Sequence, residues 1–382
     1  MCKKMHDSNF HTEKKIKFFL DNFSSLKDPR RITKGHFYFP LDEILLMSLA
    51  AALSGADGWV SISMFGKSKL EWLRQYLPYK KGIPSHDVLG KLFALIDPVQ
   101  FNVCFMGWVN SISSITEGDV VAIDGKTLCG SSSKAQGRSP FHLVSAYAAG
   151  NRLCLGQQCV SEKSNEITAI PALLDILDVQ GCVITIDAMG CQREIAQKII
   201  DCQADYILMV KDNQENLKEQ VEKVFSIQAP AHSHEHNDMG HGRIEKRTCG
   251  VIDNLDFLDD REKWVGLNSI VKIKSERTNK QTGHASVETR YYISSLKEKA
   301  DQFNNKIRQH WAIENNLHWA LDVIFKEDGT LMKKGNSAIN FSLINKMALA
   351  MLEREKSTKM SKPSKRLKAA LDDDYRHLVL KT

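Results

Sequence analysis

Apolar side chains between residues 14 and 115 recur at the three- and four-residue spacing that is typical of helices. Ser85 stands just before the apolar positions Val88, Leu89 and Leu92, and serine is a preferred helix N-cap. The spacing therefore predicts an N-terminal helical region. Two short helices between residues 66 and 96 leave two possibilities open, a DNA-binding helix-turn-helix and a plain helical bundle.

The hydrophobic period changes near residue 118. Short apolar runs predict five strands, and the segments after the third, fourth and fifth strands have the pattern of amphipathic helices. The predicted strands are 120–124, 142–149, 152–160, 183–187 and 206–210, and the helices are 164–177, 191–202 and one from Asn213. Three consecutive strands followed by alternating helices and strands predict an α/β fold, a mixed sheet flanked by helices. This is the element order of the ribonuclease H-like fold.

A different pattern interrupts the α/β region between residues 228 and 298. Residues 232–241 are polar and rich in histidine, and we expect a loop there. Alternating segments at 243–251, 270–274 and 287–293 predict strands that form a separate β-rich insertion. Helical spacing returns at 300–323 and 336–355. The predicted domains are an N-terminal helical domain (1–115), an α/β core (116–227 and 299–355), the insertion (228–298) and a basic C-terminal tail (356–382).

Basic residues gather near the end of the chain. The formal net charge of +6 permits a polyanionic partner but does not require one. Between residues 354 and 368, however, seven Lys and Arg residues accompany a single acid. Such a run suits contacts with phosphates, although by itself it is more often a solvated tail.

Cysteines and hydropathy indicate the compartment. The nine cysteines include no C-x-x-C pair, and several lie in apolar runs, which favours a reducing cytoplasm over a disulfide framework. The longest mainly apolar stretch, residues 44–53, is far shorter than the roughly 20 residues that a membrane-spanning helix needs. We therefore expect a cytoplasmic protein without a membrane segment.

Two aspartates end matching apolar strands. Asp124 follows Val-Val-Ala-Ile and Asp187 follows Val-Ile-Thr-Ile. A single Asp in this place is usually a turn-former, but two after similar strands favour a shared role, because ligands of open α/β sheets bind at the carboxyl ends of strands. Two nearby carboxylates repel each other unless a divalent cation lies between them. The pair therefore suggests a metal site.

A third acid is expected from the helix at 300–323. Glu314 falls on one helix face with His310 and His318, between two tryptophans. Asp322 and Glu327 are competing candidates for the third ligand. Zinc is a further possibility, but a structural zinc site needs four ligands and the usual pair of histidines on one turn is missing.

At these residues the chain resembles the DDE insertion-sequence transposases, most closely the H-repeat-associated group. The segments that carry the resemblance are 122–131, 186–192, 206–214, 241–247, 310–323 and 327–336, with 28–30, 65–66 and 82–86 matching the associated N-terminal domain. The likeness covers nearly the whole chain.

The resemblance implies a ribonuclease H-like core in which Asp124, Asp187 and Glu314 hold two Mg²⁺ ions, with Mn²⁺ as a substitute. The implied reaction is cleavage of phosphodiester bonds at insertion-sequence ends followed by strand transfer. It further implies DNA as the partner, a homodimer on DNA and association with the nucleoid. The candidate DNA contacts are Lys126, Lys211, Arg243, Arg247, Arg308 and His310, of which His310 stands where relatives carry Arg. For the first four of these, ordinary surface charge is an equal alternative.

Three other functions remain open at this point. A nuclease on the same fold would cut DNA without joining it, and a catalytically silent relative would only bind DNA. The third is a metal-binding module built from the histidines at 232, 234, 236 and 241.

Overall fold

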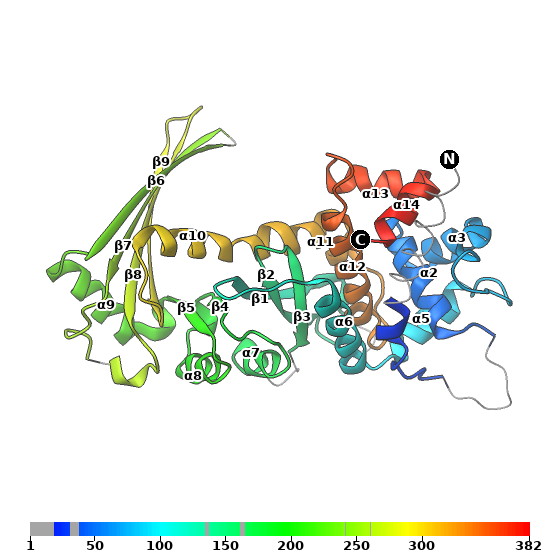
Figure 1. The fold of residues 1–382 in the computed structure, drawn as a ribbon, viewed down its shortest axis with the longest axis horizontal. Helices are drawn as coiled ribbons and strands as arrows, with labels where there is room; N and C mark the ends of the chain where they lie inside the picture. The colour runs from blue at the N-terminus through cyan, green and yellow to red at the C-terminus, as the bar shows by residue number, and fades with distance from the viewer. Residues whose placement is uncertain (1–18, 31–37, 134–136, 161–164, 241, 260) are drawn as a thin grey trace, which may run out of the picture.

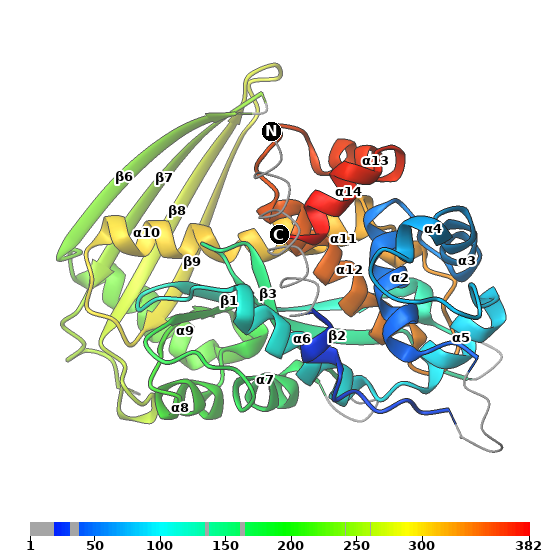
Figure 2. The same cartoon turned by 45° about the vertical axis from the view of Figure 1, so that its right-hand side comes forward.

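The computed structural model describes the chain except for residues 1–18, 31–37, 134–136, 161–164, 241 and 260. The molecule is elongated (Figures 1 and 2). Helices gather at one end, an α/β core lies in the middle, and a long curved group of strands projects at the other end.

The N-terminal region is helical, as predicted. Ser85 caps its helix by accepting a hydrogen bond from the backbone N–H of Val88, and Asp97 caps the next helix through Val99. The first long helix is buried along most of its length and packs on a C-terminal helix. The helices are α2 (Leu41–Leu53), α3 (Trp59–Ser68), α4 (Leu70–Leu73), α5 (His86–Leu95) and α6 (Pro98–Ile112).

Five strands form the core sheet in the order β3-β2-β1-β4-β5. β1 pairs antiparallel with β2 and parallel with β4, β2 pairs antiparallel with β3, and β5 is parallel to β4. This is the ribonuclease H-like arrangement that the sequence predicts. The elements are β1 (Val120–Leu128), β2 (Phe141–Ala148), β3 (Leu153–Cys159), α7 (Glu166–Leu174), β4 (Val183–Ile186), α8 (Arg193–Asp201), β5 (Asp205–Val210) and α9 (Glu215–Ile227). The helix start predicted at residue 164 lies outside the described residues.

The β-rich segment differs from the prediction in two ways. Its strands do not form a separate sheet, because β9 pairs antiparallel with β5 and the whole is one nine-stranded sheet. The loop expected at 232–241 is wrong as well, since a strand covers its first nine residues. That strand is polar on both faces and is held by backbone pairing to β7, so it has no apolar alternation to reveal it. The strands, here called the β-arm, are β6 (His232–Gly240), β7 (Arg243–Ile252), β8 (Ser269–Asn279) and β9 (Ala285–Ser294).

One long helical path links the β-arm to the helical end. α10 crosses the sheet face opposite α7 and α8 (Figure 1). Phe303 and Ile307 of α10 are buried against Val251 and Ile273 of the β-arm and Val120 of β1. The predicted helix at 300–323 is not regular, because residues 313–318 form a π-helical segment. The elements are α10 (Ala300–His310), the π-helical segment (Ile313–His318), α11 (Trp319–Val323) and α12 (Ser337–Arg354).

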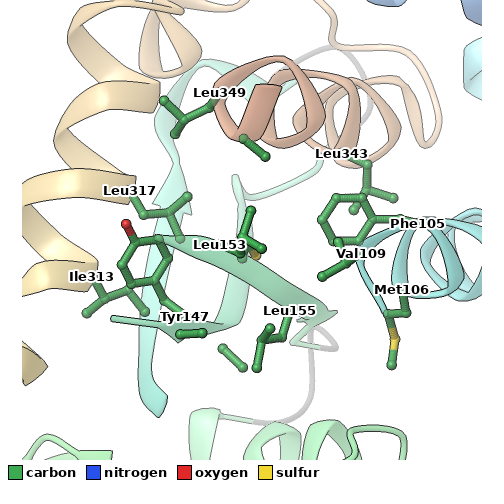
Figure 3. Close-up of a cluster of buried hydrophobic side chains, with 14 of the residues drawn as sticks. Phe105, Met106, Val109, Tyr147, Leu153, Leu155, Ile313, Leu317, Leu343 and Leu349 are labelled. Carbon is green, nitrogen blue, oxygen red and sulfur yellow. The ribbon is translucent and has the colours of Figure 1, made fainter. Parts of the chain in front are cut away.

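The largest hydrophobic core joins the helical end to the sheet. Side chains of α6, β2, β3, the π-helical segment and α12 meet there (Figure 3). Tyr147 of β2 and Leu317 of the π-helical segment are almost completely buried in this core, as is Leu349 of α12. The helix that carries Glu314 is therefore anchored to the same sheet that carries the two aspartates.

The C-terminal residues are not a solvated tail. They form α13 (Lys362–Leu371) and α14 (Asp373–Leu380), which pack on α12 and α2. Arg366 is 7% exposed and donates to the carbonyl oxygens of Ala52 at 2.8 Å and Ala56 at 3.3 Å. The basic run therefore contains residues that cap the carbonyl end of another helix, which charge counting alone does not reveal.

In the part of the chain that the structure describes, no helix by itself is both long and apolar enough to cross a membrane; α5 and α6 pass that test only as a pair bent by 92°.

Candidate active site

Asp124 and Asp187 lie side by side where β4 ends. The prediction that both end a strand is right for Asp187 and wrong for Asp124, because β1 stays paired with β2 as far as Leu128. Ile123 of β1 is in register with Ile186 of the parallel strand β4, so the two aspartates follow neighbouring backbone positions. The backbone N–H of Gly125 donates to Oδ1 of Asp124 at 2.9 Å, and that of Met189 donates to Oδ1 of Asp187 at 3.1 Å. The structure thus brings together the two carboxylates that the strand pattern singled out.

The two carboxylates share an electrostatic environment. Burial raises the pKa of Asp124 to about 7, helped by the negative charges of Asp187, Glu314 and Glu166. Burial also raises the pKa of Asp187, and the charge of Glu166 adds to this effect while Lys211 opposes it. Ionising the whole group therefore costs free energy when no cation is present.

Glu314 approaches this pair from the π-helical segment. Its pKa is raised by partial burial and by Asp187, while the guanidinium of Arg290 acts in the opposite direction. Single π-helical turns are often found at functional sites. Here the wider turn interrupts the i, i+4 spacing that the sequence pattern assumes for residues 310–318.

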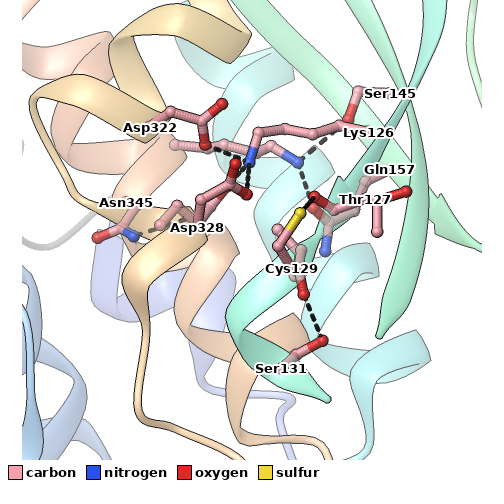
Figure 4. A network of polar contacts seen from close by, with 12 residues as sticks. Lys126, Thr127, Cys129, Ser131, Ser145, Gln157, Asp322, Asp328 and Asn345 are labelled. Atoms are coloured by element: carbon pink, nitrogen blue, oxygen red, sulfur yellow. Dashed lines mark hydrogen bonds and ion pairs between the residues drawn. The ribbon is translucent and has the colours of Figure 1, made fainter. Parts of the chain in front are cut away.

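The two competing candidates for the third acid belong to another cluster. Lys126, only 9% exposed, forms ion pairs with Asp322 at 2.6 Å, Glu327 at 3.2 Å and Asp328 at 3.5 Å (Figure 4). Glu327 also accepts a hydrogen bond from the amide of Asn345. This geometry favours Glu314 over Asp322 and Glu327, and it keeps the ammonium of Lys126 inside the protein.

Residues that follow β5 hold the turn after Asp187. Asn213 donates to the carbonyl oxygen of Ala188 at 2.7 Å, and Gln214 donates to that of Cys191 at 3.0 Å. Both residues belong to the short 3-10 helix that precedes α9. In the structure they fix the backbone that carries Asp187.

Two histidines flank Glu314 along the helix. His310 is half-buried, and its Nδ1 lies 3.0 Å from the hydroxyl of Thr185 on β4. Burial lowers the pKa of His310 to about 4, so the ring is neutral near pH 7 and cannot attract a phosphate as a cation. His318 follows Glu314 along the helix, and its Nδ1 lies 3.5 Å from Oδ2 of Asp124.

A fourth acid, Glu166, reaches the same edge. It begins α7, and its Oε1 lies 2.6 Å from Nε2 of His142 on β2. Sequence reasoning missed both residues, because an acid in the first turn of a helix is common for electrostatic reasons alone. The strand order could have indicated Glu166. Because β3 is parallel to β1, the helix that follows β3 starts on the side of the sheet where Asp124 lies.

The remaining basic candidates lie in two places. Lys211 is exposed and close enough to Asp187 to lower its pKa. Arg243 and Arg308 line a cavity of about 220 Å³ at the β-arm, where Arg308 also pairs with Asp238. Arg247 is 6% exposed, and its Nε and Nη1 have no hydrogen-bond partner. Lys211 and His310 thus accompany the carboxylates, whereas the three arginines belong to the β-arm or face it.

The carboxylate group fits a hard divalent cation that keeps much of its water. Among the described residues, no three Asp, Glu, His or Cys side chains converge on one point as they would in an all-protein metal cage. Mg²⁺ does not need such a cage, because it is usually held by one or two carboxylates together with water and phosphate oxygens. The same finding gives no support to a metal module on the histidines of β6, and His241 lies outside the described residues.

Comparison with family models identifies two segments. The model of the transposase DDE domain matches residues 115–351, and a model described as DDE_Tnp_1-associated matches residues 20–109. Among solved structures, the chain is similar to the piggyBac transposase in a synaptic complex with hairpin DNA. That likeness has a TM-score of 0.45 at 11% identity and covers 97% of this chain and 79% of the other.

Relatives of known name agree with the family models. The "H repeat-associated putative transposase YhhI" of Escherichia coli K12 is 39% identical over 96% of this chain and 98% of its own length. The "Putative transposase YncI" of E. coli O157:H7 is 40% identical over 96% of this chain and 95% of its own length. A shorter relative, the "Inactive transposase YbfQ" of E. coli K12, is 35% identical over 20% of this chain and 89% of its own length. With family models covering the helical region and the core, and with relatives similar along their whole length, the chain belongs to the transposases that have a DDE domain.

Proposed function

We propose that this transposase cleaves DNA at the ends of its insertion sequence and joins the freed 3′ ends to target DNA, with Asp124, Asp187 and Glu314 holding two Mg²⁺ ions. Mn²⁺ would substitute for Mg²⁺. The observation that supports the proposal is that the negative charges of Asp187 and Glu314, both distant in sequence, act on Asp124 beside the carboxyl end of β4. The pKa of each acid is raised, as expected where several carboxylates lie together without the cations that would stabilise their charged forms.

Each residue has a defined part in this mechanism. When bound, Mg²⁺ ions supply an activated water and neutralise charge on the phosphate that is attacked. Asp124, whose backbone pairs with Ser145 of β2, and Asp187, which directly follows β4 and caps the next turn, would hold the cations. Glu314 would complete the group from the π-helical segment. Lys211, exposed beside Asp187, is placed to contact a DNA phosphate.

DNA binding extends beyond this edge in the proposal. The helical domain (1–115) recognises the ends of the element, and Arg243 of the β-arm segment (228–298) and Arg308 of α10 contact DNA, whereas Arg247 is too deeply buried for such a contact. The core (116–227 and 299–355) carries the chemistry. The C-terminal residues (356–382) expose some basic side chains, including Lys356 and Lys359. Because transposition joins two ends, we propose a homodimer on DNA in the cytoplasm, associated with the nucleoid.

Cleavage and strand transfer can be tested together. Labelled DNA from the ends of the element is incubated with Mg²⁺ and either the wild type or Asp187→Asn, and both products are measured. Asp178→Asn is a matched control, because Asp178 is exposed and precedes β4 at the strand end opposite Asp187. We expect Asp187→Asn to lose at least about 100-fold in cleavage while still binding DNA.

The outcomes separate the alternatives. Equal activity of wild type and Asp187→Asn would remove Asp187 from the mechanism. Cleavage without joined products would identify a nuclease. Binding of end DNA by the wild type without any cleavage would identify a catalytically silent DNA-binding protein.

A further inference from the structure

The start of α7 lies over the backbone next to Asp124. A Cβ atom built on Gly125 would lie 2.1 Å from Oε1 of Glu166 and 2.5 Å from Nε2 of His142. Real Cβ contacts do not come this close, so only glycine at residue 125 leaves room for the two side chains. The carboxylate of Glu166 therefore occupies the space directly beside the residue that follows Asp124.

Glu166 is held in this place by a chain of two hydrogen bonds. Its Oε1 is 2.6 Å from Nε2 of His142, and Nδ1 of His142 is 2.8 Å from the hydroxyl of Thr127 on β1. With Nε2 donating to the carboxylate, Nδ1 is left to face the hydroxyl of Thr127. The carboxylate of Glu166 is thus linked to β2 through His142 and to β1 through Thr127.

The charge of Glu166 acts on both aspartates. It is the largest single charge that raises the pKa of Asp187, and it contributes to the raised pKa of Asp124. Its partner His142 is shared with Thr127, and the protein provides no arginine or lysine ion pair to Glu166 among the described contacts. A fourth carboxylate that repels the other two is unfavourable unless a cation offsets it.

We propose that Glu166 is a fourth carboxylate of the metal site, which binds a divalent cation directly or through its water and is positioned by His142 and Thr127. This inference depends on the proposed function, since it concerns the same cations. It adds to the three acids of the family pattern a ligand that comes from the start of α7. It also gives Gly125 a role, because any larger residue there would displace the ligand.

A purely structural role is the competing explanation. The pair of Glu166 and His142 joins α7 to β2, and in that case its loss would lower stability and leave cation binding unchanged. Binding of Mn²⁺ to the DNA-free protein, measured by calorimetry and electron paramagnetic resonance, separates the two roles without any activity assay.

The experiment compares Glu166→Gln with Glu194→Gln in the full chain. Glu194 is exposed in the first turn of α8, so both variants remove one acid from a helix start. We expect Glu166→Gln to weaken Mn²⁺ binding by at least about tenfold and Glu194→Gln to leave it unchanged. His142→Gln should weaken it as well, because the carboxylate then loses its support. If Glu166→Gln does not fold, Glu166→Asp keeps the charge, shortens the side chain and should show the same weakening.

Unchanged Mn²⁺ affinity in a folded Glu166→Gln protein would overturn the inference. Asp124→Asn in the same titration tells this failure from that of the proposed function. If Asp124→Asn weakens Mn²⁺ binding and Glu166→Gln does not, only the fourth ligand is lost. If neither variant changes it, the metal site itself is wrong.

Discussion

Nδ1 of His318 lies 3.5 Å from Oδ2 of Asp124. Burial, together with the nearby charges of Lys346 and Lys126, lowers the pKa of His318 to about 3, so the ring is neutral. A neutral imidazole can orient a carboxylate without taking the place of a cation.

From this contact we predict that His318→Ala slows end cleavage by about tenfold at saturating Mg²⁺, because Asp124 loses its neighbour. His318→Asn, whose amide can reach the position of Nδ1, should recover part of the rate. Single-turnover cleavage measures the effect, and gel-shift binding of end DNA should not change. The same rate in His318→Ala and wild type would exclude a positioning role.

The raised pKa of Asp124 predicts a pH-dependent stability of the metal-free protein. Its pKa rises from the ordinary 3.8 to about 7 on folding. The protonated form is therefore favoured in the folded state, and stability falls as the pH rises from about 4 through 7. Asp124→Asn removes this penalty and should raise the free energy of unfolding by on the order of 4 kcal/mol at pH 8.

Urea unfolding in EDTA at pH 5 and pH 8 measures that difference. The gain from Asp124→Asn should be clearly smaller at pH 5, and added Mg²⁺ should stabilise the wild type more than the variant. A gain that is equal at both pH values would contradict the shift.

Gly125 has no space for a side chain. Gly125→Ala places a methyl group against Glu166 and His142, so we expect a loss of about 1–3 kcal/mol in stability and at least about tenfold in cleavage. Gly240→Ala is the control, because nothing lies within 4 Å of its added Cβ. Thermal unfolding and end cleavage test both variants. Wild-type stability and cleavage in Gly125→Ala would show that Glu166 and His142 leave room for a side chain at residue 125.

Lys126 distinguishes a structural ion cluster from a DNA contact. Lys126→Met leaves the buried Glu327 and the partly buried Asp322 without their shared cation, and we expect a loss of about 3–5 kcal/mol in unfolding free energy. Lys333→Met, at an exposed position, should have little effect. Weaker DNA binding with unchanged stability would instead mean that Lys126 contacts phosphate.

Arg366 tests whether the C-terminal helices are part of the fold. Its guanidinium caps carbonyl oxygens at the end of α2 and lies 4.2 Å from the centre of the Phe325 ring. Arg366→Met should cost about 3 kcal/mol, because buried carbonyl groups lose their donor, whereas the exposed Lys359→Met should cost almost nothing. Urea unfolding of both variants checks this, and equal midpoints would refute it.

The sequence predicted those parts of the fold that depend on residues close together in the chain. The four residues before Asp124 and the four before Asp187 are apolar or buried because both faces of the sheet are covered there, and Ser85 caps its helix through its own backbone neighbours. These features could be found from the sequence, and so could the neighbouring positions of the two aspartates.

Features that depend on contacts between distant parts of the chain could not be predicted from the sequence. β6 has no apolar alternation, since its partner β7 holds it through the backbone. Arg366 looks like one member of a charged run until the end of α2 is placed beside it. Glu166 looks like an ordinary first-turn acid until the parallel direction of β3 and β1 brings α7 to the same edge. The π-helical turn changes the helix face that simple spacing gives to Glu314.

The pairing of β9 with β5 has a consequence for how this architecture can be altered. β5 has β4 on one side and only the last strand of the β-arm on the other. A deletion that removed 228–298 as a detachable module would leave the apolar strand β5 with an open hydrogen-bonding edge, where another chain can pair and aggregate. Shortened versions of this protein should therefore keep β9 and trim only the far ends of the hairpins.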